Sequence, residues 1–324
     1  MSLTSPKPVL IVTNPDDVTT DLVVIELQKC DVPIFRFDTA DFPQKLQLNA
    51  RLIDGQWTGT LATDQHDIAL ESVQGIYYRR PNSFQFPKEM SDTDWEFAYG
   101  QAQRGLGGVL SSLNCRWMNK PGAELLAEYK PRQLAVASES GLQTPRTLIT
   151  NNKASVMDFA GSVSGPLICK ALHAPSIFEN GEELSIFTTV LNRDELDGLA
   201  GIELTAHQFQ EWVPKQYEVR LTVANDQMFA ISIRTTSEAG QVDWRLDYGG
   251  MQKEVIEVPP QVASGVRSYL SRFGLAFGAF DFIVTPDDEW VFLECNPSGQ
   301  WAWIEDLAWP IAGAIADYLT TSNT

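Results

Sequence analysis

The sequence predicts an α/β domain at the N-terminus, followed by an α+β region with antiparallel sheets. An apolar run, a segment with helical apolar spacing and a second apolar run follow one another over residues 8–38, which is the pattern of a βαβ unit. Beyond residue 144, many apolar segments of strand length are joined by short connections, which favours antiparallel pairing. With 324 residues, the chain is long enough for two or three domains.

The N-terminal region contains regular apolar segments. Strands are expected at 8–13, 32–38 and 73–81, and helices at 19–30 and 92–113. Between the second and third strands, KLQLNARLIDGQWTGTLAT (45–63) alternates apolar and polar residues around Asp54–Gly55. Asp-Gly is a favoured two-residue turn, so this segment predicts a β-hairpin.

The second region begins near residue 119 and opens with a helix signal. Pro131 suits the first turn of a helix, and Gly141 lies where that helix would end. Further strands are expected at 144–150, at 165–172, on both sides of Pro214 within 207–226, and at 227–235. Asn225–Asp226 would form the turn before the last of these strands.

Near the C-terminus, FGAFDFIV (277–284) and WVFLEC (290–295) flank TPDDE, which predicts another hairpin. A two-residue turn bracketed by Pro286 and Glu289 fixes the expected pairs: Val284 with Val291, Phe282 with Leu293, and Asp281 with Glu294. Asn296 then lies diagonally from Asp281 on the same face of the sheet.

Two acidic side chains opposite one another in apolar strands are destabilising unless something neutralises them. A divalent cation would remove the difficulty, and the oxygens of Asp281, Glu294 and Asn296 are ligands that suit Mg²⁺. The alternative is a clamp without metal, formed by the arginines of nearby strands: Arg220, Arg234 or Arg245. Both interpretations depend on the register of the hairpin.

Composition limits the classes of protein to consider. There are 42 acidic and 24 basic residues, a net charge of −18, which opposes general affinity for nucleic acid or anionic membranes. The N-terminal apolar run is too short for a signal peptide, and no segment approaches a membrane span. The four cysteines form no CxxC and the three histidines show no metal spacing, so we expect reduced thiols in a soluble cytoplasmic protein.

Magnesium held by few protein ligands usually shares a nucleotide triphosphate. The sequence lacks the GxxxxGK[ST] motif, which excludes a P-loop. Lys130 stands immediately before the helix predicted at Pro131, and Lys170 lies in the strand GPLICKAL. These lysines are candidates to hold phosphates, although each taken alone also fits a solvated surface position.

Five motifs now resemble the ATP-grasp superfamily, in the order of that family over roughly residues 120–305: EYKPRQL, ICKAL, FQEWVPKQYEVR, FDFIV and FLECNPSGQW. Four more resemble its peptide-maturing branch: YYRRP, GLQTPRTLITN, VDWRLDY and NPSGQWAWIE. That branch comprises the graspetide synthetases, including microviridin-type ligases, and the pattern is most similar to their actinobacterial-type group. The resemblance covers nearly the whole chain.

The resemblance implies an ATP-grasp fold with three parts: an N-terminal α/β domain (1–118), a central subdomain (119–206) and a C-terminal domain (207–324), with nucleotide between the last two. It also implies a role for each matching position. Phosphates would meet Lys130 and Lys170, adenine the hinge Glu211–Trp212–Val213, ribose Glu218, and Mg²⁺ Asp281, Glu294 and Asn296. The γ-phosphate or the substrate carboxylate would meet Arg220, Arg234 and Arg245.

The implied activity is an ATP-dependent ligation within a ribosomal precursor peptide that has leader and core segments. ATP and Mg²⁺, with two ions expected, would convert an Asp or Glu side chain of the peptide to an acyl phosphate. A Ser, Thr or Lys side chain then closes an ester or amide, so no protein nucleophile is needed. A homodimer is expected by the same resemblance. Two alternatives are a glutathione-synthetase-like ligase of small amino acids and a non-catalytic nucleotide-binding scaffold.

Several further residues have two interpretations. Arg79 and Arg80 favour a structural ion pair over contact with peptide carboxylates. The tryptophans near the C-terminus favour helix packing over a peptide cradle: Trp301, Trp303 and Trp309. Ser298 and Gly299 are expected in a loop near the metal ligands, and Cys295 in the core.

Overall fold

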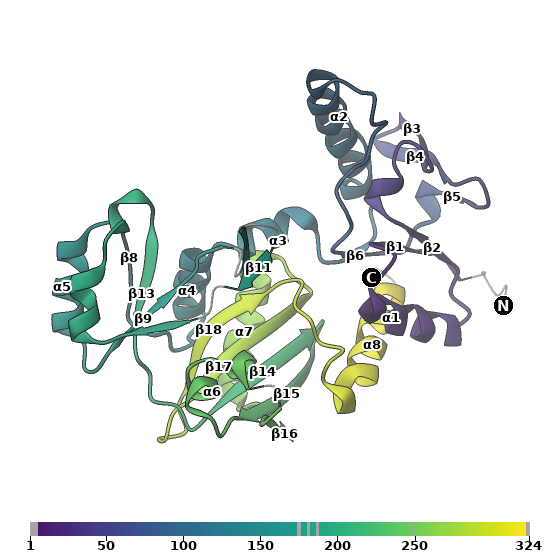
Figure 1. Ribbon diagram of the computed structural model, residues 1–324. Coiled ribbons are helices and arrows are strands. Elements are labelled where there is room, and N and C mark those ends of the chain that lie inside the picture. Colours follow the sequence, from purple (N-terminus) through teal and green to yellow (C-terminus); the bar gives the residue numbers. More distant parts are fainter. Residues whose placement is uncertain (1–5, 174–175, 180–181, 186–187, 248, 322–324) are drawn as a thin grey trace.

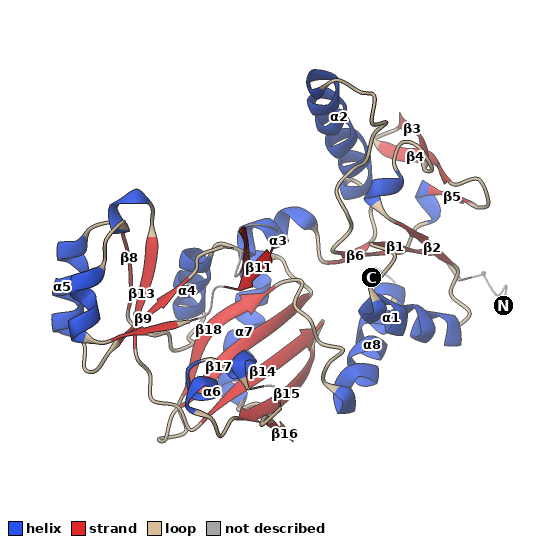
Figure 2. Cartoon of the chain, in the orientation of Figure 1, coloured by secondary structure: helices blue, strands red, loops and turns tan. Residues whose placement is uncertain are grey.

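The computed structural model describes residues 6–173, 176–179, 182–185, 188–247 and 249–321 (Figure 1). Three parts follow one another along the chain, each built on its own sheet (Figure 2). The first sheet is parallel, whereas the second and third are antiparallel. The predicted fold class, an α/β domain followed by α+β parts, is therefore confirmed.

The N-terminal part is a four-stranded parallel sheet in the order β2-β1-β6-β7, with a separate antiparallel sheet β3-β4-β5 beside it. Its elements are β1 (Val9–Thr13), α1 (Val18–Lys29), β2 (Ile34–Phe37), β3 (Gln47–Ile53), β4 (Gln56–Ala62), β5 (Asp67–Ala69), β6 (Gly75–Arg79), α2 (Asp92–Ser111) and β7 (Arg116–Met118). The predicted hairpin turn is present, and both Asp54 (φ 48°) and Gly55 (φ 78°) have the positive φ that a type I′ turn requires.

Strand β1 is buried on both faces because its side chains alternate between two cores. Val9 and Ile11 pack with α1 and with α8 (Glu305–Thr320), the last helix of the chain. Leu10 and Val12 face the opposite side, toward α2 and the small sheet. Figure 1 shows this division, with α1 and α8 on one side of the sheet and α2 on the other.

The central part is the antiparallel sheet β12-β9-β13-β8, with a separate hairpin of β10 and β11. Its elements are β8 (Thr147–Thr150), α5 (Lys153–Ser162), β9 (Leu167–Lys170), β10 (Ser176–Glu179), β11 (Glu182–Ser185), β12 (Thr189–Leu191), the 3₁₀ turns η3 (Arg193–Gly198) and η4 (Ile202–Leu204), and β13 (His207–Glu211). Strand β13 pairs with β8 and β9, so the boundary predicted at residue 207 is wrong: the strand that follows it completes the central sheet.

The C-terminal part is the antiparallel sheet β16-β15-β14-β17-β18. Its strands are β14 (Tyr217–Ala224), β15 (Gln227–Arg234), β16 (Gln252–Ile256), β17 (Phe277–Val284) and β18 (Trp290–Asn296), with short α6 (Glu238–Val242) and η5 (Trp244–Leu246) after β15. One face is covered by α3 (Pro121–Ala127), α4 (Lys130–Glu139) and α7 (Pro260–Phe273). Helices α3 and α4, predicted in the central subdomain, therefore pack on the C-terminal sheet.

Helix α8 returns to the N-terminal part, so the predicted C-terminal domain does not contain the whole of 207–324. A Cβ on Gly75, the first residue of β6, would lie 2.5 Å from Leu319 O, which shows how closely the helix approaches the sheet backbone. Trp301, in the connection before α8, is fully buried in the same core, whereas Trp309 is 46% exposed. The predicted packing role is therefore confirmed for Trp301, whereas nearly half of the Trp309 surface is exposed.

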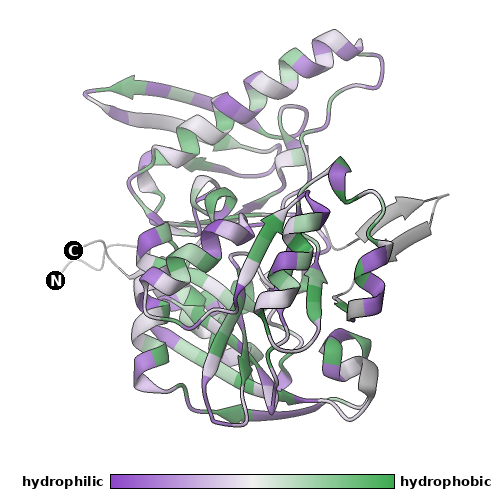
Figure 3. Cartoon of the chain, turned by 90° about the vertical axis from the view of Figure 1, so that its left-hand side faces the viewer, coloured by the Kyte–Doolittle hydropathy of each residue, from purple (hydrophilic) through white to green (hydrophobic). Residues whose placement is uncertain are grey.

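The helices that cover the sheets carry both hydrophobic and hydrophilic residues. In Figure 3 the helices show patches of both hydrophobic and hydrophilic colour, as expected where one side faces a core. Among the described helices, none is both long and apolar enough to cross a membrane. All four cysteines lie in the described residues and are free thiols; Cys295 is buried as expected, but Cys30 is exposed.

Candidate active site

A cavity of about 560 Å³ lies between the central and C-terminal sheets. This volume is within the range usual for small-molecule sites. All but one of the residues proposed from the sequence line it: Lys130, Lys170, Glu211, Trp212, Val213, Glu218, Arg220, Arg245, Asp281, Glu294 and Asn296. The exception is Arg234. Motifs separated by up to 166 positions, from Lys130 to Asn296, therefore converge on one hollow.

Arg234 does not reach the cavity because of strand alternation. In β15, Met228 and Ala230 face the helix-covered core, and Arg234 is on the same side of the strand. Its guanidinium lies 4.2 Å from the centre of the Tyr217 ring and is exposed. The residues of β15 that share the cavity face are instead Ile231 and Ile233.

The register of the β17–β18 hairpin differs from the prediction at its turn. The loop has three residues, with Asp288 at φ 59°, so the pairs next to it are Val284 with Trp290 and Phe282 with Phe292. A β-bulge at Leu293 then adds one residue to β18, and Asp281 faces Glu294 as predicted. The two irregularities offset one another, and both carboxylates lie on the cavity face.

A row of charged side chains crosses three adjacent strands. Arg220 on β14 faces Asp281 on β17, which faces Glu294 on β18. Arg220 Nε lies 3.3 Å from Asp281 Oδ1, and Asn296 Nδ2 donates to Asp281 Oδ2 at 3.4 Å. Part of the arginine clamp considered from the sequence is thus present, at Asp281.

Glu294 is paired with a lysine from another element. Lys130, the first residue of α4, places Nζ 3.1 Å from Glu294 Oε2 and also donates to Ala171 O at 2.9 Å. Burial raises the pKa of Glu294, but the Lys130 and Lys170 charges outweigh burial, so the pKa of Glu294 is lowered overall. Glu294 is therefore held ionised by the two lysines that the sequence proposed for phosphates.

At Asp281, burial has a larger effect on the pKa than the neighbouring positive charge. Burial raises the pKa of Asp281 to about 7, against the lowering effect of Arg220, and the negative charge of Glu294 adds to the rise. A cation bound between the two carboxylates would stabilise the ionised form of both. Within the described residues, no group of three or more His, Cys, Asp or Glu side chains could hold a metal, so the two carboxylates and the Asn296 amide would need further oxygens from a ligand.

The cationic side of the cavity fits an anionic ligand. Burial lowers the pKa of Lys170, and the Lys130 ammonium lowers it further, while Glu294 opposes the shift. Arg220 is only 8% exposed, and its Nη1 atom has no hydrogen-bond partner among the described residues. A buried guanidinium with an unused donor, next to two lysines, is suited to phosphate oxygens.

The hinge connects the two sheets at the end of β13. Glu211 N donates to Arg146 O at 3.1 Å, and Glu211 Oε1 accepts from Arg146 N at 2.8 Å. Trp212 N donates to Pro166 O at 3.3 Å. The Glu211 N–H is therefore already used, which leaves its carbonyl as a backbone contact for a base, and the hinge backbone is fixed by the central sheet.

Two residues at the site, Lys215 and Gln133, were not identified from the sequence, and a third, Asp243, belongs to the VDWRLDY motif but had no assigned role. Asp243 is buried and accepts two hydrogen bonds from the Arg245 guanidinium, from Nε at 2.8 Å and from Nη2 at 2.5 Å, and these bonds raise the pKa of Arg245. Lys215 forms an ion pair with Glu218, the proposed ribose contact, whose pKa burial nevertheless raises. The Gln133 side-chain amide accepts from Cys295 N and donates to Cys295 O. The DWR sequence was a usable signal for Asp243; the other two were not distinguishable from ordinary polar residues.

Comparison with known proteins identifies similar sequences and structures. Residues 8–124 match the family model described as the MvdD pre-ATP grasp domain. No curated protein matches the sequence. Among solved structures, a RiPP-associated ATP-grasp ligase of Chryseobacterium gregarium in complex with ADP and a leader and core peptide is 29% identical, with a TM-score of 0.87 over 97% of this chain and 96% of that one.

Two further structures are similar over their whole length. The macrocyclase MdnC of Microcystis aeruginosa MRC, bound with the precursor peptide MdnA, is 30% identical, with a TM-score of 0.81 over 96% of this chain and 99% of that one. The ATP-grasp ligase PsnB, complexed with a phosphomimetic variant of its minimal precursor, Mg and ADP, is 22% identical, with a TM-score of 0.73 over 97% and 99%. At that identity PsnB supports the fold alone.

Proposed function

The chain belongs to the family of ATP-grasp ligases that act on ribosomally made precursor peptides, and from this premise we propose that it joins side chains within one such peptide. It is an ATP-dependent ligase. The proposed reaction phosphorylates Asp or Glu side chains of the core peptide and closes ester or amide macrocycles with Ser, Thr or Lys. The peptide would carry a leader segment, as in the Chryseobacterium complex.

One observation carries the proposal. The row Arg220–Asp281–Glu294 lies in the same cavity as Lys130 and Lys170, so cations flank two adjacent carboxylates in one hollow. A phosphoryl-transfer site needs this combination, because the cations stabilise phosphate oxygens and the carboxylates hold a divalent ion. A scaffold that bound a nucleotide without a metal ion would not need both.

Each side chain then has a proposed task. Lys130 and Lys170 hold phosphates, and Asp281, Glu294 and Asn296 hold Mg²⁺, which when bound neutralises charge on the triphosphate. The Glu211 carbonyl and the Val213 backbone meet adenine, and Glu218 meets ribose. Arg220 and Arg245 face the transferring phosphoryl group or the peptide carboxylate. Arg234 has no place in this scheme.

The chemistry balances without a nucleophile from the protein. A carboxylate oxygen of the peptide attacks the γ-phosphorus, the bond to the ADP oxygen breaks, and an acyl phosphate forms. A hydroxyl or amine of the same peptide then attacks the acyl carbon. The bond between the acyl carbon and the phosphate oxygen breaks, phosphate leaves, and the nucleophile loses a proton. The cavity contributes orientation and charge stabilisation to both steps.

The experiment incubates purified protein with ATP, Mg²⁺ and a peptide encoded beside its gene that is rich in Thr or Ser and in Asp or Glu. We expect the peptide to lose the mass of one water molecule per bond formed, and ADP and phosphate to appear in equal amounts. Glu294→Gln should abolish both, because the amide no longer carries the charge that a divalent ion needs. Turnover of free amino acids with no change in the peptide would contradict the proposal.

Three finer features belong to the same proposal. Two Mg²⁺ ions are proposed because a triphosphate offers more oxygens than one ion and these few protein ligands can use. A cytoplasmic location is proposed because the reaction consumes ATP and the four cysteines are free. A homodimer is proposed from the family alone, and light scattering of the purified protein measures it directly.

A further inference from the structure

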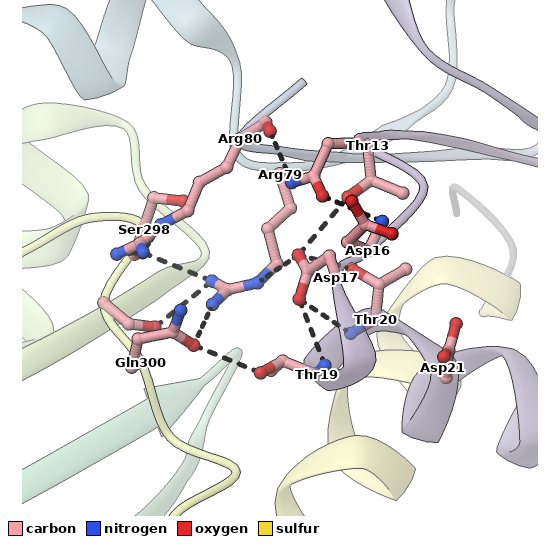
Figure 4. Close-up of polar contacts among 12 residues, drawn as sticks. Thr13, Asp16, Asp17, Thr19, Thr20, Asp21, Arg79, Arg80, Ser298 and Gln300 are labelled. Atoms are coloured by element: carbon pink, nitrogen blue, oxygen red, sulfur yellow. Dashed lines mark hydrogen bonds and ion pairs between the residues drawn. The ribbon is translucent and has the colours of Figure 1, made fainter. Parts of the chain in front are cut away.

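Arg79, at the end of β6 in the N-terminal part, is a buried arginine outside the cavity. It is 2% exposed, and its Nε lies 3.0 Å from Asp17 Oδ2. The other guanidinium nitrogens reach across to the segment after β18: Nη1 donates to Ser298 O and Gly299 O, each at 3.2 Å, and Nη2 donates to Gln300 Oε1 at 2.6 Å. Figure 4 shows the side chain between Asp17 and this segment.

Other side chains from the first half of the chain hold the same segment. Arg80 donates to Ser298 O from Nε at 3.1 Å and from Nη2 at 2.9 Å, and Asn119 donates to Pro297 O at 2.9 Å. Every carbonyl from 297 to 299 is therefore bound by a side chain from outside the C-terminal sheet. Asn296, the proposed magnesium ligand, immediately precedes them.

The segment has little room to shift. A Cβ on Gly299 would lie 2.5 Å from the Cβ of Ala279 and 3.1 Å from that of Asn296, so the main chain here presses on β17. Ala279 faces Asn296 in the hairpin and is two residues from Asp281, on the same face of its strand. A displacement of residues 297–300 would therefore reach two of the three proposed metal ligands.

We infer that Arg79 is a positioning residue for the magnesium site: it fixes the main chain after Asn296 from the N-terminal part of the molecule, and thereby the place of Asn296 beside Asp281. Arg79 does not line the cavity, so it acts through this segment and not on the substrate. The inference rests on the proposed function. It also gives the N-terminal part a task in the reaction, because Asp17, which caps α1, holds the arginine in place.

The test is binding of Mg·ADP, measured by calorimetry, in the full-length protein and in Arg79→Lys. Lysine keeps a positive charge near Asp17 but has one nitrogen, which cannot span a carboxylate, two carbonyls and an amide. We expect binding about tenfold weaker or more, the usual cost of losing a group that orients a metal ligand. Hydrogen exchange of amides in residues 296–301 should be faster in the variant.

Arg272→Lys is the matched control, because Arg272 forms an exposed ion pair with Glu139 at 3.0 Å, away from the cavity. It should leave Mg·ADP binding unchanged. If Arg79→Lys does not fold, Asp17→Asn decides, since asparagine still caps α1 but lacks the charge that orients Arg79; we expect a smaller loss of affinity in the same direction.

Three outcomes overturn the inference. Wild-type affinity for Mg·ADP in a folded Arg79→Lys, or in Asp17→Asn where the lysine variant does not fold, overturns it while leaving the proposed function intact. An equal loss in Arg272→Lys would show a general effect of removing an arginine. If the unmodified protein itself does not bind Mg·ADP, the proposed function falls and the inference falls with it.

Discussion

Gln133 on α4 shows how one side chain can replace a missing strand neighbour. Its Oε1 accepts from Cys295 N at 2.9 Å, and its Nε2 donates to Cys295 O at 2.9 Å and to Ala127 O. Strand β18 is at the edge of its sheet, so these bonds satisfy main-chain groups that another strand would otherwise bind. Cys295 lies between Glu294 and Asn296, which makes Gln133 part of the support of the site.

Replacing Gln133 by leucine should therefore destabilise the protein. Gln133→Leu leaves the N–H and C=O of Cys295 buried without this partner, which costs on the order of 2–3 kcal/mol in free energy of unfolding. Denaturation in urea measures the change. Ser138→Ala, at an exposed position of the same helix, should stay within about 0.5 kcal/mol of the parent, and an equally small effect in Gln133→Leu would contradict the role given to this amide.

At this scale the sequence was informative where a residue's chemistry is specific. The carboxylates, lysines and hinge residues belong to distinctive motifs, and they converge on the cavity. The partners of those residues were not predictable: Ser298 O lies 219 positions from Arg79, and nothing local in YYRRP indicates which carbonyl its arginines bind. Long-range partners depend on how three sheets pack, which periodicity does not encode.

Strand β15 illustrates why a motif residue can lie on the wrong side of its element. Arg220 and Arg234 are both arginines on neighbouring strands, yet only Arg220 is on the cavity face. The pair therefore provides a matched comparison within one sheet. Arg220→Gln should lower kcat/KM for peptide modification by roughly 100-fold or more, because a buried cation next to the transferring group is lost.

Arg234→Gln should change the same kcat/KM by less than about threefold, since its side chain stacks on Tyr217 on the opposite face. Steady-state release of phosphate in the presence of peptide measures both variants. Comparable losses in the two would mean that Arg234 meets the substrate, against the orientation described above.

The β17–β18 hairpin shows that strand register could be predicted only in part from the sequence. The pairing of Asp281 with Glu294 follows from the sequence only if the turn has two residues, and the turn has three. The bulge at Leu293 restores the expected pair, but a bulge has no clear signature in WVFLEC. Local turn chemistry was decisive at Asp54–Gly55, where both residues tolerate positive φ. The three-residue loop at 286–288 was compatible with several registers.

Across the whole molecule, the N-terminal part approaches the C-terminal part at Glu124 of α3. Burial raises the pKa of Glu124 to about 8; a hydrogen bond from Asn119 at 3.4 Å and the charges of Arg79 and Arg80 oppose the rise. The folded protein therefore keeps a proton on this carboxyl, between about pH 4.5 and pH 8, that the unfolded chain has released. Stability should fall as the pH rises through this window.

Glu124→Gln removes this titration. The variant should be more stable than the parent at pH 8.5, by on the order of 1–3 kcal/mol given the partial exposure of the side chain, and nearly equal to it at pH 4.5. Urea denaturation at several pH values measures the difference. A parent and variant with parallel profiles from pH 5 to 8 would show that Glu124 is ionised throughout.

The division of the chain into consecutive domains was the least accurate prediction at this scale. Sequence order suggested breaks at 118 and 206, but β13 completes the central sheet, α3 and α4 cover the C-terminal sheet, and α8 packs on the first. Each correction has the same cause: an element joins the apolar surface that it fits, and this surface belongs to whichever sheet is adjacent in space.

The position of α8 also has a consequence for synthesis of the protein on the ribosome. The face of the first sheet that carries Val9 and Ile11 is covered by α1 and by α8, and α8 is translated only after the central and C-terminal sheets. In a nascent chain, the part of this face that α8 covers therefore stays exposed while the central and C-terminal sheets emerge, and exposed apolar surface favours aggregation during elongation.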